Sequence, residues 1–507
     1  KKRVPIPAAG TTTVFTEARA ASTERSVEFC INAKPTAPTP TTGLRPEACT
    51  LYMDELRFIL AFPSRHRKVH CGVSYSCRSF LTSSIQRMVQ LSKHIAFVGL
   101  GYIGLPTAVV MANSGLDVTG VDVMPEKVES INRGEITIVE PGLESELQSA
   151  LASGRFRAST EMPKADAYVV AVPTPFTETH DVDMKFIYSA AEAIAPQLEG
   201  DELIILESTS PPRTTERMAR RILDLRPDLQ PDSDEAIPDA RRIYFAHCPE
   251  RILPGRAMEE LRSNDRIIGG MSPEATRRAK DIYLSFCNGE LLETNDRTAE
   301  LAKLTENSFR DVNIAFANEL SLICDQLEID VWELIDLANH HPRVNILQPG
   351  PGVGGHCIAV DPWFIVSSAP ETAKLIRLSR DVNDGKPKWV LQKIQDEVSR
   401  LDEDAKIALF GLAFKPDIDD LRESPALGIA REVASNETER DVLLVEPNIT
   451  QLPPQLQDLP NVTLTTADEA LQQADVIALL VDHFQFKNIP ADLLEGKQVI
   501  DTRGIWR

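Results

Sequence analysis

The chain has 507 residues, of which 42% are hydrophobic and 25% charged, and its formal net charge is −21. This length predicts several globular domains, and the lack of any run of about 18 apolar residues argues against an integral membrane protein. The acidic charge lies in residues 88–507, because residues 1–87 hold 13 Lys and Arg against 6 Asp and Glu. Such a body repels phosphate backbones, so no nucleic-acid partner is expected.

Residues 1–87 are rich in Thr, Ser, Pro, Ala and Arg and lack sustained hydrophobic periodicity, which predicts a disordered extension. An Arg- and Ser-rich start is also typical of a transit peptide. Met88 stands just before the first convincing strand, and we favour the hypothesis that the native chain starts there. An N-terminus mapped by mass spectrometry well upstream of Met88 would contradict it.

From residue 94 onward, short apolar strands alternate with helical segments, which is the pattern of βαβ units. The first series of expected strands comprises 94–99, 117–123, 168–172, 203–206 and 243–246. A long helix is predicted over 298–327, and a second series follows with strands 406–410, 441–445, 475–481 and 498–500. These elements predict an α/β fold in which two Rossmann-like, doubly wound domains are joined by a central helical domain with a long helix.

A glycine-rich turn follows the first strand, with Gly99, Gly101 and Gly104 in GLGYIG at the start of an apolar helix. In this dinucleotide fingerprint the first glycine allows the tight turn, the second lets a pyrophosphate approach, and the third lets helix pack on strand. Asp122 lies near the end of the second strand, 18 positions beyond Gly104. A carboxylate there accepts hydrogen bonds from a ribose 2′-OH and repels a 2′-phosphate, so NAD is predicted rather than NADP.

Two further turns, 172–175 and 207–209, follow predicted strands, and ligands bind at such strand ends in open parallel sheets. Each turn alone is explained equally well as an ordinary loop.

Of the eight cysteines, which show no CxxC metal spacing and are typical of reduced thiols, Cys357 has the most unusual context. Four glycines fall within residues 350–355, just before it. Glycines weaken regular structure, so we expect them to let the backbone approach a ligand and to deliver Cys357 as a nucleophile. Asp361 follows four residues later, on the same face if the segment is helical. An inert buried thiol is the alternative.

The predicted helix 298–327 has two faces. Apolar residues recur along one side at a 3.6-residue period and are expected to form core: Leu301, Val312, Phe316, Leu320, Ile323 and Leu327. Lys303, Asn307 and Arg310 recur on roughly the opposite side, so three polar groups are predicted to point together. A solvated face is the alternative for these three residues.

Four more basic residues stand near turns or strand ends, at Arg251, Arg343, Lys415 and Arg422. In an acidic chain they are candidates to bind an anion, since Arg supplies bidentate donors to phosphate. Together with the cofactor site they predict a phosphorylated or nucleotide-linked substrate.

Three segments carry a resemblance to a known family: residues 300–307 (ELAKLTEN), 352–363 (GVGGHCIAVDPW) and 410–425. In these motifs the chain resembles the UDP-glucose/GDP-mannose dehydrogenase family, over about residues 93–507. The resemblance implies an NAD-binding Rossmann domain at 88–290, a central helical dimerisation and catalytic domain at 291–395, and a UDP-sugar-binding Rossmann-like domain at 396–507. It also implies a homodimer, and the scattered single cysteines separately predict a cytoplasmic protein.

The resemblance further implies that Cys357 is the nucleophile, that Lys303 and Asn307 steady charge at the sugar oxygen, and that Asp361 and Glu250 activate water. Residues that match cofactor contacts are Gly99, Gly101, Tyr102, Ile103, Gly104, Asp122, Thr174 and Thr209. Residues that match the grip on the UDP-sugar are Arg251, Ile252, Lys303, Asn307, Arg310, His341, Arg343, Gly354, Lys415 and Arg422. One departure, Arg213 where the family usually has Gly, leaves the geometry of the nicotinamide loop open.

The activity implied is a four-electron oxidation of the C6 alcohol of a UDP-sugar to a carboxylate, with NAD, through a thiohemiacetal and a thioester on Cys357. A single-step dehydrogenase of the hydroxyacid type would need no such cysteine, and a nucleotide-sugar sensor would not turn over. The three hypotheses predict two, one and no NADH per sugar. The residues alone do not choose among UDP-N-acetylmannosamine, UDP-glucose and GDP-mannose.

Overall fold

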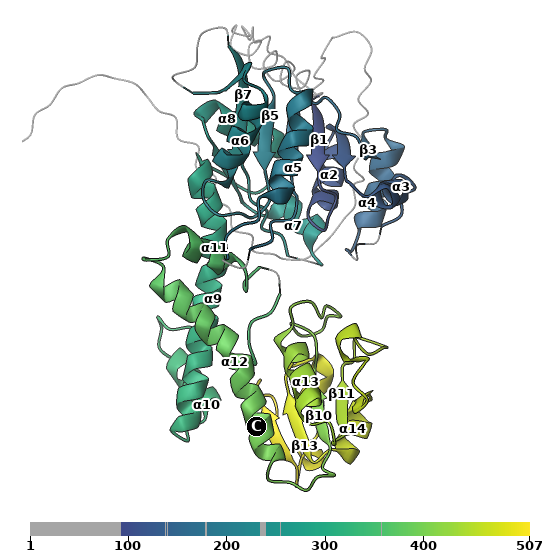
Figure 1. The fold of residues 1–507 in the computed structure, drawn as a ribbon, viewed down its shortest axis with the longest axis vertical. Coiled ribbons are helices and arrows are strands. Elements are labelled where there is room, and N and C mark those ends of the chain that lie inside the picture. Colours follow the sequence, from purple (N-terminus) through teal and green to yellow (C-terminus); the bar gives the residue numbers. More distant parts are fainter. Residues whose placement is uncertain are drawn as a thin grey trace, which may run out of the picture. The chain divides into compact units, whose positions relative to one another are not determined.

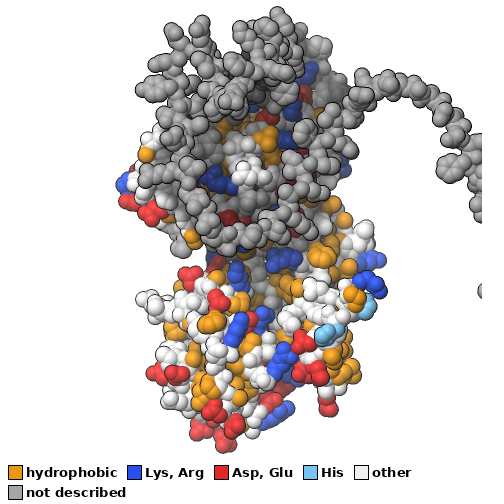
Figure 2. All heavy atoms as spheres, turned by 180° about the vertical axis from the view of Figure 1, so that it is seen from behind, with side chains coloured by type: hydrophobic (Ala, Val, Ile, Leu, Met, Phe, Trp, Pro, Cys, Tyr) orange, Lys and Arg blue, Asp and Glu red, His pale blue; other side chains and the backbone are white. Residues whose placement is uncertain are grey.

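The computed structural model describes residues 93–136, 138, 140–177, 180–233, 240–253, 255–355 and 357–507 (Figure 1). The expected extension 1–87 and the hypothesis of a start at Met88 lie outside these residues. No helix in the described ranges is long and apolar enough to cross a membrane. On the face drawn in Figure 2, acidic and basic side chains are interspersed over the described part of the chain.

The first sheet is built of βαβ units, the first of which begins with β1. Its strands are β1 (His94–Val98), β2 (Asp117–Val121), β3 (Phe156–Ser159), β4 (Ala167–Val170), β5 (Leu203–Leu206), β6 (Leu229–Pro231), β7 (Arg241–His247), β8 (Arg266–Gly270) and β9 (Leu291–Asn295). Their order is β3-β2-β1-β4-β5-β7-β8-β9, with β6 on β7, and only the β7–β8 pairing is antiparallel among the pairings described. Strands β4 and β5 are buried at every residue, as expected for parallel strands covered on both faces.

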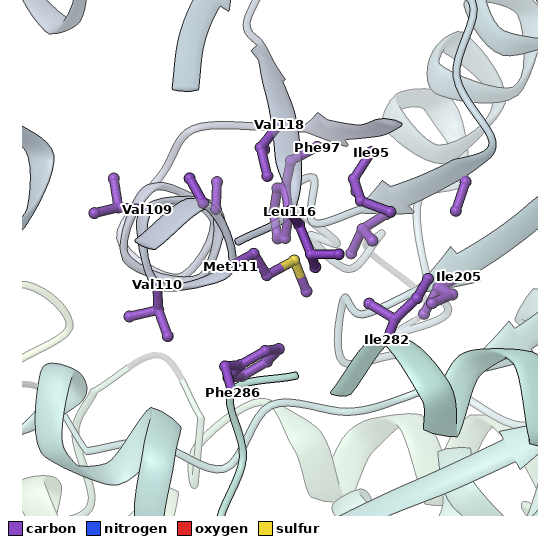
Figure 3. Packing of buried hydrophobic residues seen from close by; sticks show 14 of the residues in the cluster. Ile95, Phe97, Val109, Val110, Met111, Leu116, Val118, Ile205, Ile282 and Phe286 are labelled. Carbon is purple, nitrogen blue, oxygen red and sulfur yellow. The ribbon is translucent and has the colours of Figure 1, made fainter. Parts of the chain in front are cut away.

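Helices cover this sheet and supply its core. They are α2 (Gly104–Asn113), α3 (Pro125–Asn132), α4 (Leu143–Ala152), α5 (Lys185–Ile194), α6 (Thr214–Leu225), α7 (Ala257–Ser263) and α8 (Pro273–Tyr283), with a 3₁₀ turn η1 (Ala195–Gln197). Figure 3 shows Met111 of α2 among Phe97 of β1, Ile282 of α8 and Phe286, which share one buried apolar cluster. This packing holds the glycine turn between β1 and α2 in place.

A long helix, α9 (Asp296–Gln326), opens the second part of the described chain and matches the predicted helix 298–327. It begins where the Asn295 side chain accepts a hydrogen bond from the Thr298 N–H, which caps the first turn. It is followed by α10 (Val331–Asn339), α11 (Asp361–Ser368) and α12 (Lys374–Val398), and α9 lies beside both α11 and α12.

The expectation that the apolar stripe of α9 forms core is wrong. Phe316 and Leu327 are 52% and 62% exposed, and Leu301 and Ile323 are exposed as well. The buried side consists mostly of small or polar residues instead, among them Asn307, Ser308, Asp311, Ala315 and Asn318, with Leu304 as an apolar member. Asp311 pairs at 2.6 Å with Arg380 of α12, which is 1% exposed. Periodicity shows that a helix has two faces, but not which of them packs on the rest of the chain.

The second sheet lies in the C-terminal residues and is wholly parallel. Its strands are β10 (Ile407–Phe410), β11 (Val442–Val445), β12 (Val462–Leu464), β13 (Val476–Leu479) and β14 (Gln498–Asp501), in the order β12-β11-β10-β13-β14. Helices α13 (Pro425–Asn436) and α14 (Ala467–Gln473) and the 3₁₀ turns η2 (Pro454–Leu456), η3 (Phe484–Asn488) and η4 (Ala491–Leu493) complete it. Both sheets have the doubly wound order, so the predicted fold class is confirmed.

Candidate active site

The glycine turn between β1 and α2 is built by close backbone contacts. A Cβ on Gly104 would lie 1.8 Å from the carbonyl oxygen of Gly99, and one on Gly99 would lie 2.5 Å from that of Ala171. A Cβ on Gly101 would meet nothing within 4 Å. Packing therefore explains the first and third glycines, whereas the second faces open space, as a turn that admits a pyrophosphate requires.

Asp122 lies beside this turn and is 9% exposed. Its carboxylate accepts hydrogen bonds from the backbone N–H groups of Leu100 and Met124, both at 3.1 Å. It also forms an ion pair with the Lys127 ammonium at 2.8 Å. Burial opposes ionisation, but these donors outweigh it and lower the pKa of Asp122. The ionised Asp122 would repel the 2′-phosphate of NADP, so the turn is suited to NAD.

The other predicted cofactor residues surround the same sheet edge. The Thr174 hydroxyl donates to the Thr209 carbonyl at 2.7 Å, so the turns after β4 and β5 meet. Ile103 is half-buried as the N-cap of α2, and the Tyr102 hydroxyl donates to Glu140 at 2.6 Å. These contacts bring together residues that the sequence predicted only separately.

Arg213 adopts a left-handed conformation, with φ of +76°. It is the N-cap of α6, and its backbone N–H donates to Glu300 at 2.6 Å, while that of Thr215 donates to the same carboxyl at 2.8 Å. Glycine is the residue that adopts this conformation without strain, which explains why a glycine suits this position. Burial raises the pKa of Glu300 to about 7.

The glycines before Cys357 have protein neighbours rather than an open approach. A Cβ on Gly350 would lie 2.5 Å from Nη1 of Arg503, and one on Gly354 would lie 2.6 Å from the Glu423 carbonyl oxygen. Gly355 has φ of +83° and faces the Phe414 ring. Close approach of neighbouring parts of the chain thus also requires glycine here, and the contact of Gly354 with a substrate stays a prediction.

Cys357 ends this segment as the first residue of a turn into α11. Its carbonyl oxygen accepts the N–H groups of Val360 and Asp361, at 3.1 and 2.9 Å. The side chain is exposed at the surface, yet enough protein surrounds the thiol that burial raises its pKa. The Asp361 carboxylate raises the pKa of the thiol further, whereas Lys303 and Arg310 act to lower it. All three charged groups therefore act on the sulfur.

Asp361 is the most deeply buried of these groups, at 3% exposed. The Asn307 side-chain N–H donates to its Oδ2 at 2.6 Å, which joins α9 to α11. Burial raises the pKa of Asp361 to about 6, against the effects of Asn307 and Lys303. Lys303 is half-buried and Arg310 exposed on the same side of α9. The structure thus brings Cys357, Lys303, Asn307 and Asp361 together, as the sequence predicted.

Glu250 has a different environment from Asp361. Its Oε1 accepts the Arg251 N–H at 2.7 Å, and its Oε2 binds Nη2 of the buried Arg266 at 2.7 Å. The Arg251 guanidinium pairs with Glu306 of α9 at 2.8 Å, and the half-buried Ile252 packs against the apolar core. Arg266 was not among the residues predicted from the sequence. Its position as a charged residue at the start of the apolar strand RIIGG could have indicated a buried ion pair.

The remaining predicted substrate residues are more scattered. Arg422 binds Asp420 through Nε and Nη2, at 2.9 and 2.6 Å, and lines a pocket of about 320 Å³ at the start of α13. Lys415 is half-buried. His341 and Arg343 are exposed after α10, where the Arg343 N–H donates to Nδ1 of His341, and in the described ranges neither side chain contacts Cys357. In the described ranges, no group of three metal-binding side chains is close enough to hold an ion.

Three family models cover the described chain. They are the NAD binding domain, central domain and UDP binding domain of the UDP-glucose/GDP-mannose dehydrogenase family, and they match residues 93–287, 297–385 and 408–507. The chain belongs to the UDP-glucose/GDP-mannose dehydrogenase family. Membership of this family, with its NAD-binding domain, makes the chain an NAD-dependent oxidoreductase and confirms NAD as the predicted cofactor.

Relatives narrow the comparison within the family. A UDP-N-acetyl-D-mannosamine dehydrogenase of Yersinia pestis is 55% identical over 420 residues, which cover 82% of this chain and 99% of the relative. An NDP-N-acetyl-D-galactosaminuronic acid dehydrogenase of Ralstonia nicotianae is 52% identical over 412 residues, 81% of this chain and 96% of that one. The solved structure of a Pyrococcus horikoshii UDP-D-ManNAc dehydrogenase is 36% identical, with a TM-score of 0.70 over 82% of this chain and 96% of its own.

Proposed function

We propose that the chain is a UDP-N-acetyl-D-mannosamine 6-dehydrogenase, which oxidises the sugar C6 alcohol to a carboxylate. The observation that carries the proposal is the cluster of Cys357, Lys303, Asn307 and Asp361, in a chain 55% identical to enzymes of that name. A nucleophilic thiol supports the oxidation of an alcohol beyond the aldehyde, because it holds the aldehyde for a second oxidation.

The β1–α2 turn and Asp122 would hold NAD, which would supply the hydride acceptor for each of the two oxidations. The thiol of Cys357 adds to the aldehyde carbon, a C–S bond forms, and the thiol proton ends on the oxygen of the thiohemiacetal. The Lys303 ammonium, which acts electrostatically on the same sulfur, stabilises negative charge on that oxygen. Oxidation of the thiohemiacetal gives a thioester, and water cleaves its C–S bond. Overall, one alcohol, two NAD⁺ and one water give one carboxylate, two NADH and three protons.

Asp361 is the base that we assign to thioester hydrolysis, in preference to Glu250. A carboxylate with a pKa of about 6 is ionised near neutral pH and remains basic enough to take a proton from water. Both Glu250 oxygens already accept hydrogen bonds, one from the Arg251 N–H and one from the Arg266 guanidinium, so each is engaged by the protein rather than left to a water. Asn307 orients Asp361, because its side-chain N–H is bonded to Oδ2.

The nucleotide half of the substrate is assigned to cationic residues of the predicted substrate set. Arg251 and Arg422 are each held by a carboxylate, Glu306 and Asp420, so they are oriented before a diphosphate arrives. The match of residues 408–507 to a UDP binding domain supports a UDP-linked sugar. We retain the division into an NAD-binding domain at 88–290, a central domain at 291–395 and a UDP-sugar domain at 396–507 as part of the proposal.

We also propose a homodimer that covers the exposed apolar side of α9. Phe309, Phe316 and Leu327 are 69%, 52% and 62% exposed there, and Leu337 of α10 is 64% exposed. Several large apolar side chains exposed on one side of a helix are typical of a protein interface. A cytoplasmic location is proposed because Cys248, Cys287, Cys324 and Cys357 are all free thiols, which a reducing compartment preserves.

Counting NADH per sugar tests the proposal. UDP-N-acetylmannosamine, UDP-N-acetylgalactosamine, UDP-glucose and GDP-mannose would be supplied singly in limiting amount and followed at the NADH absorbance. We expect two NADH per UDP-N-acetylmannosamine and a uronate product. One NADH would indicate simple alcohol oxidation, and none with any sugar would indicate a sensor. Cys357→Ala, given the 6-aldehyde, should form no carboxylate, and retained formation would refute the covalent scheme.

A further inference from the structure

A buried arginine lies beneath the ligand-binding edge of the first sheet and is not used by the chemistry above. Arg266 is 3% exposed, and its guanidinium lies 5.1 Å from the centre of the Tyr283 ring and 5.3 Å from that of Phe286. Its Nη2 binds Glu250 at 2.7 Å, and its Nη1 lies 3.8 Å from Oε1 of Glu207. One guanidinium therefore serves two carboxyl groups.

These three residues come from neighbouring strands at one edge. Glu207 follows β5, Glu250 follows β7 after two residues, and Arg266 opens β8, which is antiparallel to β7. Glu207 directly precedes Ser208, whose hydroxyl donates to the Val172 carbonyl at 2.7 Å in the cofactor loop. The cluster thus lies at the carboxyl ends of the parallel strands, where ligands bind in such sheets.

The charges of the cluster do not balance if both carboxyl groups are ionised. Glu207 is 2% exposed, its Oε2 has no hydrogen-bond partner among the described residues, and its Oε1 accepts the Tyr283 hydroxyl at 3.1 Å. The other titratable group that faces it is Cys248, from the segment after β7. A second buried negative charge would be costly, so a neutral Glu207 is favoured. Burial, with Glu250 next, raises the pKa of Glu207 to about 8.

We propose that Arg266 and a protonated Glu207 are positioning residues, which fix the Glu250–Arg251 turn and through it the Arg251 guanidinium. Because Glu250 accepts the backbone N–H of Arg251, the direction of the Glu250 carboxylate sets the course of the chain there. An ionised Glu207 competes for Arg266 and releases Glu250. The inference rests on the proposed function in one respect: it takes Arg251 to contact the diphosphate of a UDP-linked substrate.

The competition predicts a loss of substrate affinity at alkaline pH rather than a loss of chemistry. At pH 7 Glu207 holds its proton and Arg266 stays on Glu250. As the pH rises above about 8, Glu207 loses the proton and the turn loosens. We expect the dissociation constant for UDP to rise about tenfold between pH 7 and pH 9.5, as for the loss of one hydrogen bond to a charged group.

The decisive variant is Glu207→Gln, a neutral isostere of the protonated acid, in the full chain. Calorimetric titration with UDP alone, from pH 6.5 to 9.5, should give wild-type affinity at pH 7 and no alkaline loss. In turnover, KM should lose its alkaline rise while kcat stays unchanged. Glu202→Gln is the matched control, because Glu202 is a 9% exposed carboxyl at the opposite end of β5, bonded to the N–H groups of Glu199 and Gly200.

Different results would contradict the positioning role of Glu207 and the proposed dehydrogenase function. An alkaline loss that persists in Glu207→Gln, or that disappears equally in Glu202→Gln, would overturn the inference. So would a wild-type affinity for UDP that does not change with pH. Arg266→Lys retains the charge but not the two-sided geometry, and should weaken UDP binding at pH 7 by about tenfold. If UDP binds as described but no sugar yields NADH, the proposed function fails while the positioning role stands.

Discussion

Replacing Asp361 with Asn separates the two carboxyl groups that were candidates to activate water. Asp361 is 3% exposed, its Oδ2 is held by Asn307 at 2.6 Å, and its pKa of about 6 leaves it ionised above that pH. The amide retains the shape and a hydrogen bond to Asn307, but it cannot accept the proton of water. Loss of a general base slows a step by about 10² to 10⁴-fold. Because burial disfavours the ionised carboxyl, the neutral amide should not weaken folding.

The prediction is checked by rapid mixing of Asp361→Asn with saturating NAD and sugar. We expect a burst of two NADH per active site, followed by turnover slowed by 10² to 10⁴-fold, roughly. Mass spectrometry should find the sugar as a thioester on Cys357. In the wild type, hydrolysis should fall as pH drops through about 6, since Asp361 then gains a proton. Glu250→Gln is the control, and should hydrolyse the thioester rapidly. Fast hydrolysis in Asp361→Asn, or a thioester that accumulates only in Glu250→Gln, would refute the assignment.

Three further predictions follow from other parts of the chain. Arg213→Gly removes the strain of a left-handed arginine, with φ of +76°, and should stabilise the protein by about 0.5–1 kcal/mol. Arg220→Gly is the control within α6, where glycine should destabilise the protein by about 1 kcal/mol. Calorimetric melting checks this pair, and a loss in both variants would contradict it. Asp122→Asn should raise KM for NAD about tenfold and improve the relative use of NADP, which steady-state kinetics with each cofactor measures. Phe316→Glu places a charge on the exposed side of α9 and should give monomers in analytical ultracentrifugation, and an intact dimer would exclude that face.

Local patterns explain which parts of the site could be predicted from the sequence. The turn at Gly99–Gly104 depends on a strand, a tight turn and a helix that follow one another directly. Cys357 and Asp361 are four residues apart, and the Cys357 carbonyl accepts the Asp361 N–H at 2.9 Å. Lys303 and Asn307 share a side of α9 because of helical periodicity alone. In each case, the residues that act together lie within one or two turns of chain.

Contacts between distant segments explain what the sequence did not reveal. Arg266 meets Glu207 and Glu250 only because β5, β7 and β8 are neighbours in the sheet. Gly350 approaches Arg503 and Gly354 approaches the Glu423 carbonyl, and both partners lie far along the chain from the glycines. The side of α9 that is buried is the one that packs against α12, where Arg380 forms a buried ion pair with Asp311. None of these partners can be identified from the periodicity of a single segment.

One side of α9 connects the two halves of the proposed reaction. Glu300 holds the backbone N–H groups of Arg213 and Thr215, next to the cofactor loop. Lys303 lies one turn further on and acts on the Cys357 thiol, and Asn307, a turn beyond, orients Asp361. At about 1.5 Å per residue, the seven-residue separation of Glu300 and Asn307 spans about 10 Å of continuous helix. A helix resists bending over so short a length. The cofactor loop at Arg213–Thr215 and the base Asp361 therefore keep a constant separation. The thioester on Cys357 can then be formed and hydrolysed without moving between two sites.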